Sequence, residues 1–342
     1  MPDSILAERL TAQGLSGPPL PDAVAVAERL LAVQGQDPRG FRLAVRARTE
    51  GLSAADVERA LAGRELVVTW LNRGTLHLVR SEDYPLLQAL TAPPLFTSCK
   101  RRLRQEGVGE AVAELALKTI ERALADDGPL PRQQLRERLD SAGVPTEGQA
   151  LIHLLFLAAV RGLVVRGPMI GKQHAYVLTR EWLGEAAAIE RDVALAELAR
   201  RYLVGHQPAT DRDLARWAGL PLRDARAGLA AIAAELEEGE GGLVRLKKRP
   251  ADGDIPPPRL LGAFDPVLLG WTSREDVIGR HTSLVTRNGI FHPFAMAGGR
   301  AVARWGFPAG KVNLQPLERL PAAVAAALEV DAADIARFLT AP

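Results

Sequence analysis

The feature of this sequence that most constrains its fold is an order of segments that occurs more than once along the chain. In residues 131–178, PRQQLRERL and QALIHLLFLAAVRG have the spacing of helices, and the β-rich segments LVVRG and HAYVLT follow them. The order returns from Thr210, which with Asp213 predicts a capping box for DRDLARWA, ahead of the helix LRDARAGLAAIAAEL and the strand LVRLKK. Helix, turn, helix and wing is the order of a winged-helix unit, so we predict two such units here.

A third copy lies nearer the N-terminus. Ser53 and Asp56 cap a predicted helix that ends at Gly63, and the strands ELVVTWL and TLHLV flank the turn Asn72-Arg73-Gly74. Upstream, a helix is predicted from Pro21-Asp22 through AVAVAERLLAV, and long helices are predicted at 81–92, 95–105, 110–125 and 185–204. The chain is therefore predicted to contain three tandem winged-helix units, at residues 1–108, 109–183 and 184–250.

The pattern changes after residues 239–258, which are rich in Gly and Pro and mark a boundary. Beyond them RLLGAF, VLLGW, SLVTRNGIFHPFAM, RAVARWGF and KVNLQPL have the composition of strands, with turns at Asn288-Gly289 and Gly298-Gly299 and a terminal helix at 321–339. We predict a small β-rich domain at 259–342. The predicted fold class is mainly α with small β hairpins (α+β), with tandem winged helix-turn-helix units and this C-terminal domain.

The composition excludes several classes of protein. Cys99 is the only cysteine, so no internal disulfide can form, and the longest uncharged apolar run, 150–160, is about half the ~20 residues that span a bilayer. The N-terminus lacks a basic-then-apolar leader, so we expect a cytoplasmic protein with no membrane partner. The six histidines show no paired ligand spacing, and neither G-x-S-x-G nor G-x-G-x-x-G occurs, so we expect no metal and no cofactor.

Positive charge is concentrated in a few places, although Lys and Arg number 43 against 41 Asp and Glu. Three basic clusters stand out: Lys100-Arg101-Arg102 with Arg104, Arg245 with Lys247-Lys248-Arg249, and the series Arg274, Arg280, His281 and Arg287. Each cluster indicates either phosphate contact or a solvated surface. The second follows a wing strand and the third flanks hairpin strands, which are shapes that can reach a groove of DNA. The candidate DNA contacts are therefore Lys247, Lys248, Arg274, Arg280, His281 and Arg287.

Two glutamines flank a glycine in the segment VQGQDP, residues 33–38. Asp37 is a good N-cap and Pro38 a good first residue for a new helix, so the preceding helix must end near Gly35. Residues two apart point about 200° apart on a continuous helix, whereas in an extended junction they share a face. The motif thus indicates either two amides aimed at one target or two unrelated surface amides.

Three segments in order, LLAVQGQDP, TWLNRGTLHLV, and LLGAFDPVLLGW with NGIFHPFAMAGGRAVARWG, resemble the AlkZ/YcaQ-like winged-helix DNA glycosylases, from about Leu30 to Phe307. The resemblance implies three tandem winged-helix units that shape a basic concave surface, and a Gln-x-Gln or Gln-x-Asp motif that carries base excision. Gln34 and Gln36 fall on that motif. The middle position, usually aliphatic or at least bulkier in the family, is Gly35 here, which loosens the backbone between the amides.

Amide side chains suffice for one kind of base excision. An N7-alkylated guanine is already cationic, so it departs as a neutral base with little help from a general acid. Glutamine oxygens can accept from a water beneath the anomeric carbon and face the charge that develops on the sugar. No lysine in the motif can form a Schiff base, so we expect monofunctional hydrolysis, by a monomer, of bulky or crosslinked N-alkylpurines in duplex DNA.

Other residues of these segments have competing interpretations. Arg73 and His77 either contact DNA from a wing or, for His77, point outward from a strand. Asp37 is either a base or, as we predict, a helix cap, and Asp265 is predicted to cap a turn. Packing, rather than base stacking, is predicted for three aromatic residues: Trp70, Phe264 and Trp271.

Two function classes without catalysis stay open. Winged helices serve regulators more often than enzymes, so the alternative is a non-catalytic winged-helix DNA-binding transcriptional regulator. A regulator should prefer one operator and ignore Gln34→Ala, whereas a lesion enzyme should lose turnover and keep its affinity. A protein-interaction scaffold would show no salt-dependent affinity for DNA.

Overall fold

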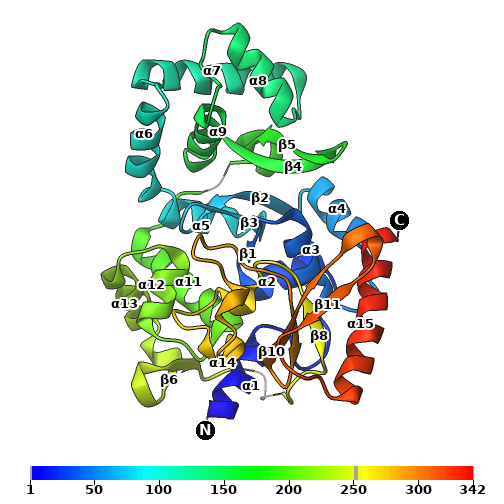
Figure 1. Ribbon diagram of the computed structural model, residues 1–342. Helices are drawn as coiled ribbons and strands as arrows, with labels where there is room; N and C mark the ends of the chain where they lie inside the picture. Colours follow the sequence, from blue (N-terminus) through cyan, green and yellow to red (C-terminus); the bar gives the residue numbers. More distant parts are fainter. Residues whose placement is uncertain (1, 186, 250–252, 342) are drawn as a thin grey trace. The chain divides into compact units, whose positions relative to one another are not determined.

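The computed structural model describes residues 2–185, 187–249 and 253–341. The chain divides into two compact units, of which the first combines residues 1–57 with 192–342 and the second is residues 58–191. Both units mix helices with small antiparallel sheets (Figure 1). The four domains predicted from the sequence are a finer division and stay a prediction. Part of the predicted boundary at 239–258, residues 250–252, lies outside the described residues.

The second unit contains a sheet in which β3, β2, β4 and β5 are neighbours in that order. Its strands pair antiparallel, and they are β2 (Leu66–Leu71), β3 (Thr75–Arg80), β4 (Val164–Ile170) and β5 (Gln173–Leu178). The N–H of Gly74 donates to the carbonyl of Leu71 at 2.9 Å, and Asn72 and Gly74 have positive φ, which closes the hairpin at the predicted turn.

Helices pack around this sheet: α5 (Tyr84–Thr91), α6 (Leu95–Gln105), α7 (Glu110–Asp127), α8 (Arg132–Ser141), α9 (Ala150–Val160) and α10 (Thr179–Leu183). The helix α4 (Ala54–Ala62) crosses the division between the units. The helix α9 contacts α6, α7, β2 and β4, which explains why it is apolar on nearly every side. The order α8, α9, β4, β5 is the order of helices and strands predicted for this segment.

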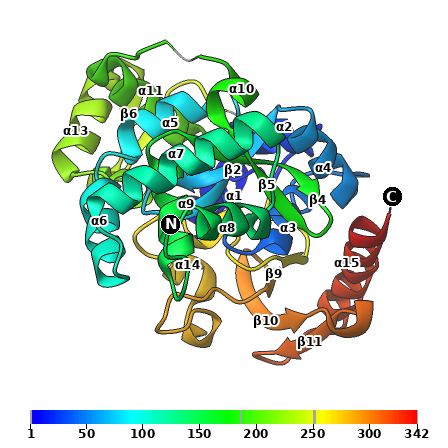
Figure 2. The ribbon, with the colours of Figure 1, turned by 90° about the horizontal axis from the view of Figure 1, so that it is seen from above.

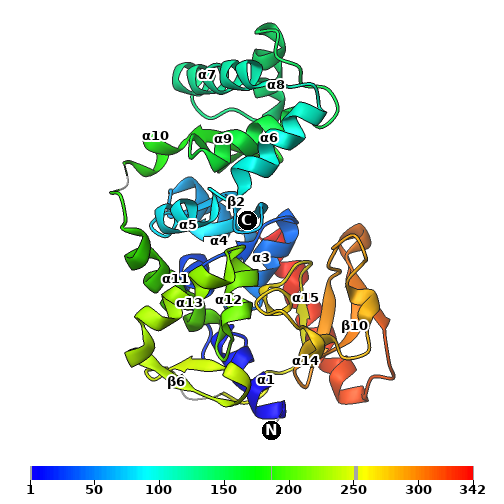
Figure 3. The same cartoon turned by 90° about the vertical axis from the view of Figure 1, so that its left-hand side faces the viewer.

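The helices of the first unit come from both of its segments: α1 (Pro2–Ala12), α2 (Ala23–Leu30), α3 (Pro38–Arg46), α11 (Arg191–His206), α12 (Asp211–Ala218) and α13 (Leu222–Ala231). Figure 3 shows α11, α12 and α13 grouped together. Thr210 and Asp213 form the predicted capping box, and Gly219 ends α12 with φ 71°. The helix α13 ends before the predicted residue 236 because β6 (Leu236–Glu238) pairs with β7 (Val244–Leu246).

The C-terminal part of this unit is a four-stranded antiparallel sheet in the order β11-β10-β9-β8. Its elements are β8 (Arg259–Leu261), α14 (Glu275–Ile278), β9 (Phe294–Ala297), β10 (Arg300–Gly306), β11 (Asn313–Pro316) and α15 (Ala322–Thr340). Figure 2 shows β9, β10 and β11 in succession. Leu6 and Leu10 of α1 share a buried core with Phe294 and Met296 of β9, so the two ends of the chain form one core.

Some predictions for this unit were wrong in detail. VLLGW is not a strand, because Asp265 accepts a hydrogen bond from the N–H of Val267 and starts a 3₁₀ turn at Pro266–Leu268. The helix α1 was not predicted, and the helix predicted at 185–204 begins at Arg191. The turn at Asn288-Gly289 forms, but only an isolated bridge between Val285 and Phe291 accompanies it.

Candidate active site

The glutamine motif lies at the junction between α2 and α3. The helix α2 ends at Leu30, earlier than predicted, because Leu31 adopts φ 61° and ψ −42°. The N–H of Ala32 donates to the carbonyl of Leu30 at 2.7 Å, which completes a γ-turn of a rare and strained type. The side chain of Leu31 is fully buried, and this packing holds the turn. The chain is thereby turned out of the helix into the short strand β1 (Val33–Gln34).

The two glutamines differ in exposure. Gln34 is buried, at 6%, whereas Gln36 is exposed. The backbone between them is not helical, which is the condition under which two amides two residues apart can face one target. One amide therefore lies inside the protein and the other reaches the surface.

Asp37 has the predicted role of helix cap. Its Oδ1 accepts from the N–H of Gly40 at 2.7 Å, and Pro38 is the first residue of α3. The carboxylate is engaged in this cap, which disfavours its use as the base. The cap also fixes where α3 begins relative to Gln36.

The first turn of α3 packs directly against backbone that follows β8. A Cβ atom on Gly40 would lie 2.3 Å from the carbonyl oxygen of Ala263, and a Cβ atom on Gly262 would lie 2.9 Å from the carbonyl oxygen of Gly40. Only glycines permit this approach. The helix that follows the motif is thus held against the segment GAFDP.

A buried ion pair strengthens the same contact. Arg48 and Asp265 both have fully buried side chains, and their two hydrogen bonds measure 2.9 and 3.0 Å. Asp265 also accepts from the N–H of Val267, so its predicted turn-capping role is confirmed. Arg48 donates further to the backbone carbonyl of Gln13 at 2.7 Å. Sequence reasoning missed this pair, since nothing local links residues that are 217 positions apart.

A second arginine ties α3 to α15. The guanidinium of Arg46 binds Asp331 and Asp334, and the Oδ2 atom of Asp331 also accepts from the N–H of Leu260 at 2.7 Å. Arg46 therefore anchors α3 to α15 and β8, and Arg48 anchors the residues after α3 to the turn that Asp265 caps.

A pocket of about 240 Å³ opens beside the first turn of α3. Its lining includes Asp37, Arg39, Leu43, Pro293, Trp305 and Phe307. The first lining residue, Asp37, directly follows Gln36 in the sequence, so a cavity with two aromatic side chains in its walls begins where the motif ends.

The hairpin candidates Arg73 and His77 are in different environments. Arg73 is exposed at the turn between β2 and β3. His77 is buried, with Nδ1 2.9 Å from the carbonyl oxygen of Thr75, and burial, reinforced by Arg73, lowers the pKa of His77 to about 3. The expectation that His77 points outward was wrong, because the central residues of β3 are buried on both faces. A role for either residue in DNA contact stays a prediction.

The remaining candidate contacts lie in two places. Lys247 and Lys248 are exposed after β7, and Lys247 donates to the carbonyl of Ala234 at 2.9 Å. The third cluster is spread around α14. Arg280 and His281 lie 3.8 and 3.6 Å from Glu318, Arg274 stacks 5.1 Å over the ring of Phe291, and Arg287 is exposed. Their contact with DNA also stays a prediction.

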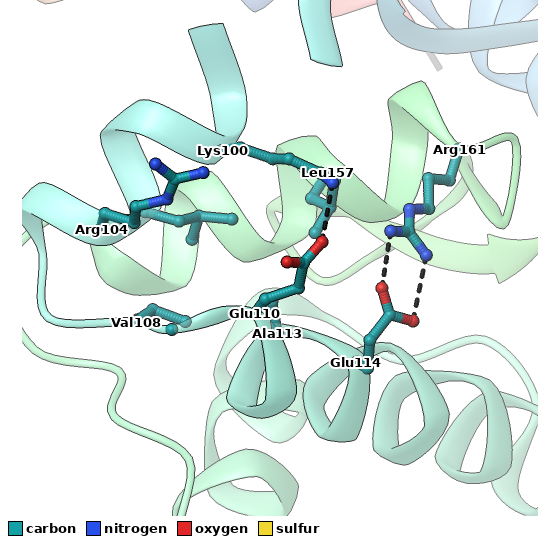
Figure 4. Close-up of a pocket in the computed structure, with 10 residues that line it drawn as sticks. Lys100, Arg104, Val108, Glu110, Ala113, Glu114, Leu157 and Arg161 are labelled. Carbon is teal, nitrogen blue, oxygen red and sulfur yellow. Dashed lines mark hydrogen bonds and ion pairs between the residues drawn. The ribbon is translucent and has the colours of Figure 1, made fainter. Parts of the chain in front are cut away.

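Two residues of the cluster that begins at Lys100, Lys100 itself and Arg104, line a pocket of the second unit (Figure 4). Lys100 pairs with Glu110 at 2.8 Å, and Arg161 forms a two-bond pair with Glu114 at 2.6 and 3.0 Å. Of the four basic residues in this cluster, Lys100 is thus paired with a carboxylate, and contact of the cluster with phosphate stays a prediction.

The aromatic residues assigned to packing are confirmed in that role. Trp70 meets Phe156 edge to face at 5.8 Å, Phe264 meets Phe291 at 5.4 Å, and the indole N–H of Trp271 donates to the carbonyl of His206 at 2.9 Å. Within the described residues, no three His, Cys, Asp or Glu side chains gather as a metal site, and no helix there is long and apolar enough to cross a membrane.

Comparison with known proteins gives a consistent picture. A curated relative from Streptomyces sahachiroi, described as an interstrand DNA cross-link repair glycosylase, is 29% identical, and the alignment covers 97% of this chain and 95% of the relative. The solved structure of the Streptomyces sahachiroi DNA glycosylase AlkZ is 26% identical and superimposes with a TM-score of 0.79, covering 98% of this chain and 96% of that one. The family model described as DNA glycosylase AlkZ-like matches residues 27–338. The chain therefore belongs to the AlkZ-like DNA glycosylase family and is a hydrolase of N-glycosidic bonds.

Proposed function

We propose that this enzyme removes bulky or crosslinked N-alkylpurines, above all N7-alkylguanine, from duplex DNA, and that Gln34 and Gln36 hold the attacking water. The observation that carries the proposal is the non-helical junction in which Gln34 is buried and Gln36 is exposed. The relative that repairs interstrand crosslinks supports the substrate class. Family membership favours this function over that of a regulator.

The amide side chains of the two glutamines act on both the attacking water and the sugar. An amide oxygen accepts a hydrogen bond from the water without being protonated and places partial negative charge toward the sugar as the bond breaks. The strained turn at Leu31 and the Asp37 cap hold the two ends of the motif, so the amides are positioned before DNA binds. As the oxygen of the water bonds to the anomeric carbon, the glycosidic bond breaks, its electron pair leaves with the alkylated base as a neutral molecule without a general acid, and the proton lost by the water passes to solvent. Because no lysine lies in the motif, the product is an abasic site in an intact strand.

We further propose that tandem winged-helix units present the basic side chains to DNA. Arg73, Lys247 and Lys248 follow or connect hairpin strands, and Arg287 lies in a loop before β9. Phosphate contacts of this kind orient a duplex without reading its sequence. That property suits an enzyme that must find lesions in any sequence, acting as a cytoplasmic monomer.

The test is single-turnover excision of N7-methylguanine and of a bulky N7-alkylguanine from one duplex sequence. We expect Gln34→Ala and Gln36→Ala each to lower the rate by about 10²-fold or more, while affinity for the duplex changes less than about threefold. Gln133→Ala, on the exposed face of α8, is the matched control and should behave as the unsubstituted enzyme.

The product is detected as a strand break that appears only after alkali. Breaks without alkali would contradict monofunctional hydrolysis. Full turnover in the doubly substituted Gln34→Ala, Gln36→Ala protein would refute the catalytic assignment.

A further inference from the structure

The pocket beside α3 is distinct in chemistry from the glutamine motif that it adjoins. It measures about 240 Å³ and takes its walls from α3 and from the ends of β9 and β10. These elements belong to one compact unit, and α3 is fixed to the backbone after β8 by the Gly40 and Gly262 contacts. The pocket is therefore a built feature of the fold rather than a gap left by side chains at the surface.

Its walls are flat and mostly apolar. The indole N–H of Trp305 donates to the carbonyl of Leu261 at 2.8 Å, so this buried ring is fixed and its polar atom is already satisfied. The ring of Phe307 is half-buried, and the guanidinium carbon of Arg39 lies 5.7 Å from its centre. Pro293 and Leu43 complete the apolar lining.

The lining of the pocket carries one cation and one carboxylate. Arg39 is exposed, whereas the Asp37 carboxylate is engaged with the N–H of Gly40. Aromatic faces with a guanidinium at the edge attract planar, electron-rich rings. The volume of the pocket is below the ~300–1,000 Å³ of sites for drug-sized molecules, so it suits a group of one or two rings.

We propose that this pocket binds the planar aromatic part of the alkylating agent carried by the lesion. The inference rests on the proposed function and deepens it by naming a substrate class. A base that is crosslinked to the opposite strand cannot flip completely out of the duplex. The group that can enter a pocket whose lining begins at Asp37, the residue after Gln36, is therefore the appendage that projects from the base. The aromatic appendage then selects the lesion while the glutamines act at the sugar.

The test compares duplexes of one sequence that carry either N7-methylguanine or N7-(2-naphthylmethyl)guanine. Stacking of one base on an aromatic side chain is worth about 5- to 150-fold in affinity. Phe307→Ala should therefore lower the ratio of kcat/KM for the naphthylmethyl duplex over the methyl duplex by about fivefold or more. Phe96→Ala removes an equally half-buried ring from α6, outside the pocket, and should leave that ratio unchanged. An unchanged ratio in Phe307→Ala would overturn the proposal.

A binding measurement separates failure of the pocket from failure of the proposed function. In a Gln36→Ala background, the affinity for the two duplexes is measured by fluorescence anisotropy, which needs no turnover. We expect a preference of about tenfold for the naphthylmethyl duplex, and its loss when Phe307→Ala is added. Absence of the preference refutes the pocket even if excision occurs. A preference without excision in the unsubstituted enzyme refutes the proposed function and leaves the pocket standing.

Discussion

Replacing Asp265 by asparagine tests the anchor that holds α3 in place. The change keeps the shape of the side chain and its acceptor for the N–H of Val267, but it removes the negative charge from a pair in which both side chains are fully buried. Arg48 then remains buried with hydrogen bonds to carbonyl oxygens of Ala44 and Gln13 and no counter-charge. Breaking one side of such a pair costs about 3–5 kcal/mol. The retained hydrogen bonds place Asp265→Asn at the lower end, about 3 kcal/mol.

The assay is urea unfolding followed by tryptophan fluorescence. Trp217, Trp271 and Trp305 lie in the same compact unit as the substitution and report on it. The control is Asp126→Asn, which breaks a pair with Arg122 at 3.5 Å in which the side chains are 66% and 86% exposed. The control should lose less than about 0.5 kcal/mol, because exposed pairs contribute little. An Asp265→Asn protein within about 1 kcal/mol of the unsubstituted enzyme would refute the reasoning.

Two further predictions follow from buried groups. Burial lowers the pKa of His206 to about 4, so the unfolded imidazole, with a pKa of ~6.5, takes up a proton that the folded one does not. Stability from this residue is complete above about pH 6.5 and falls as the pH drops toward 4, by about 2 kcal/mol at pH 5. The loss between pH 7.5 and 5, measured by urea midpoints, should be smaller in His206→Asn, and equal losses would contradict the assignment. Gly40→Ala should lower stability by about 1–3 kcal/mol, because the new Cβ would meet the Ala263 carbonyl at 2.3 Å. Gly306→Ala, in β10, where the new Cβ would meet only Pro308 at 3.8 Å, is the control in thermal melts, and similar melting of both would argue against the close contact.

The local features of the fold could be predicted because short-range bonds define them. Asp37 and Pro38 start α3, Thr210 and Asp213 cap α12, and the turn at 72–74 closes a hairpin. Each of these depends on side chains or backbone groups within three or four residues, which the sequence displays directly.

The features that position the motif could not be predicted in the same way. Leu31 is a residue type that rarely adopts positive φ, and only its complete burial accounts for the turn that ends α2. One of the two interpretations of His77 placed it on an outer face of its strand, but its side chain is buried, and that burial depends on what covers the strand. VLLGW has the composition of a strand, and the Asp265 cap, combined with the Arg48 pair, makes its beginning a 3₁₀ turn instead.

The amino-acid sequence by itself determined where several helices and hairpins begin and which glutamines form the motif, since capping groups, turn residues and the recognisable motifs each lie within a short stretch of chain. Only the tertiary structure decided that Gln34 is buried and Gln36 exposed, that Arg48 reaches Asp265, and that an aromatic pocket adjoins α3. The physical reason is that burial and ion pairing depend on contacts between residues far apart in the chain, and no local pattern of residues encodes which partners will meet.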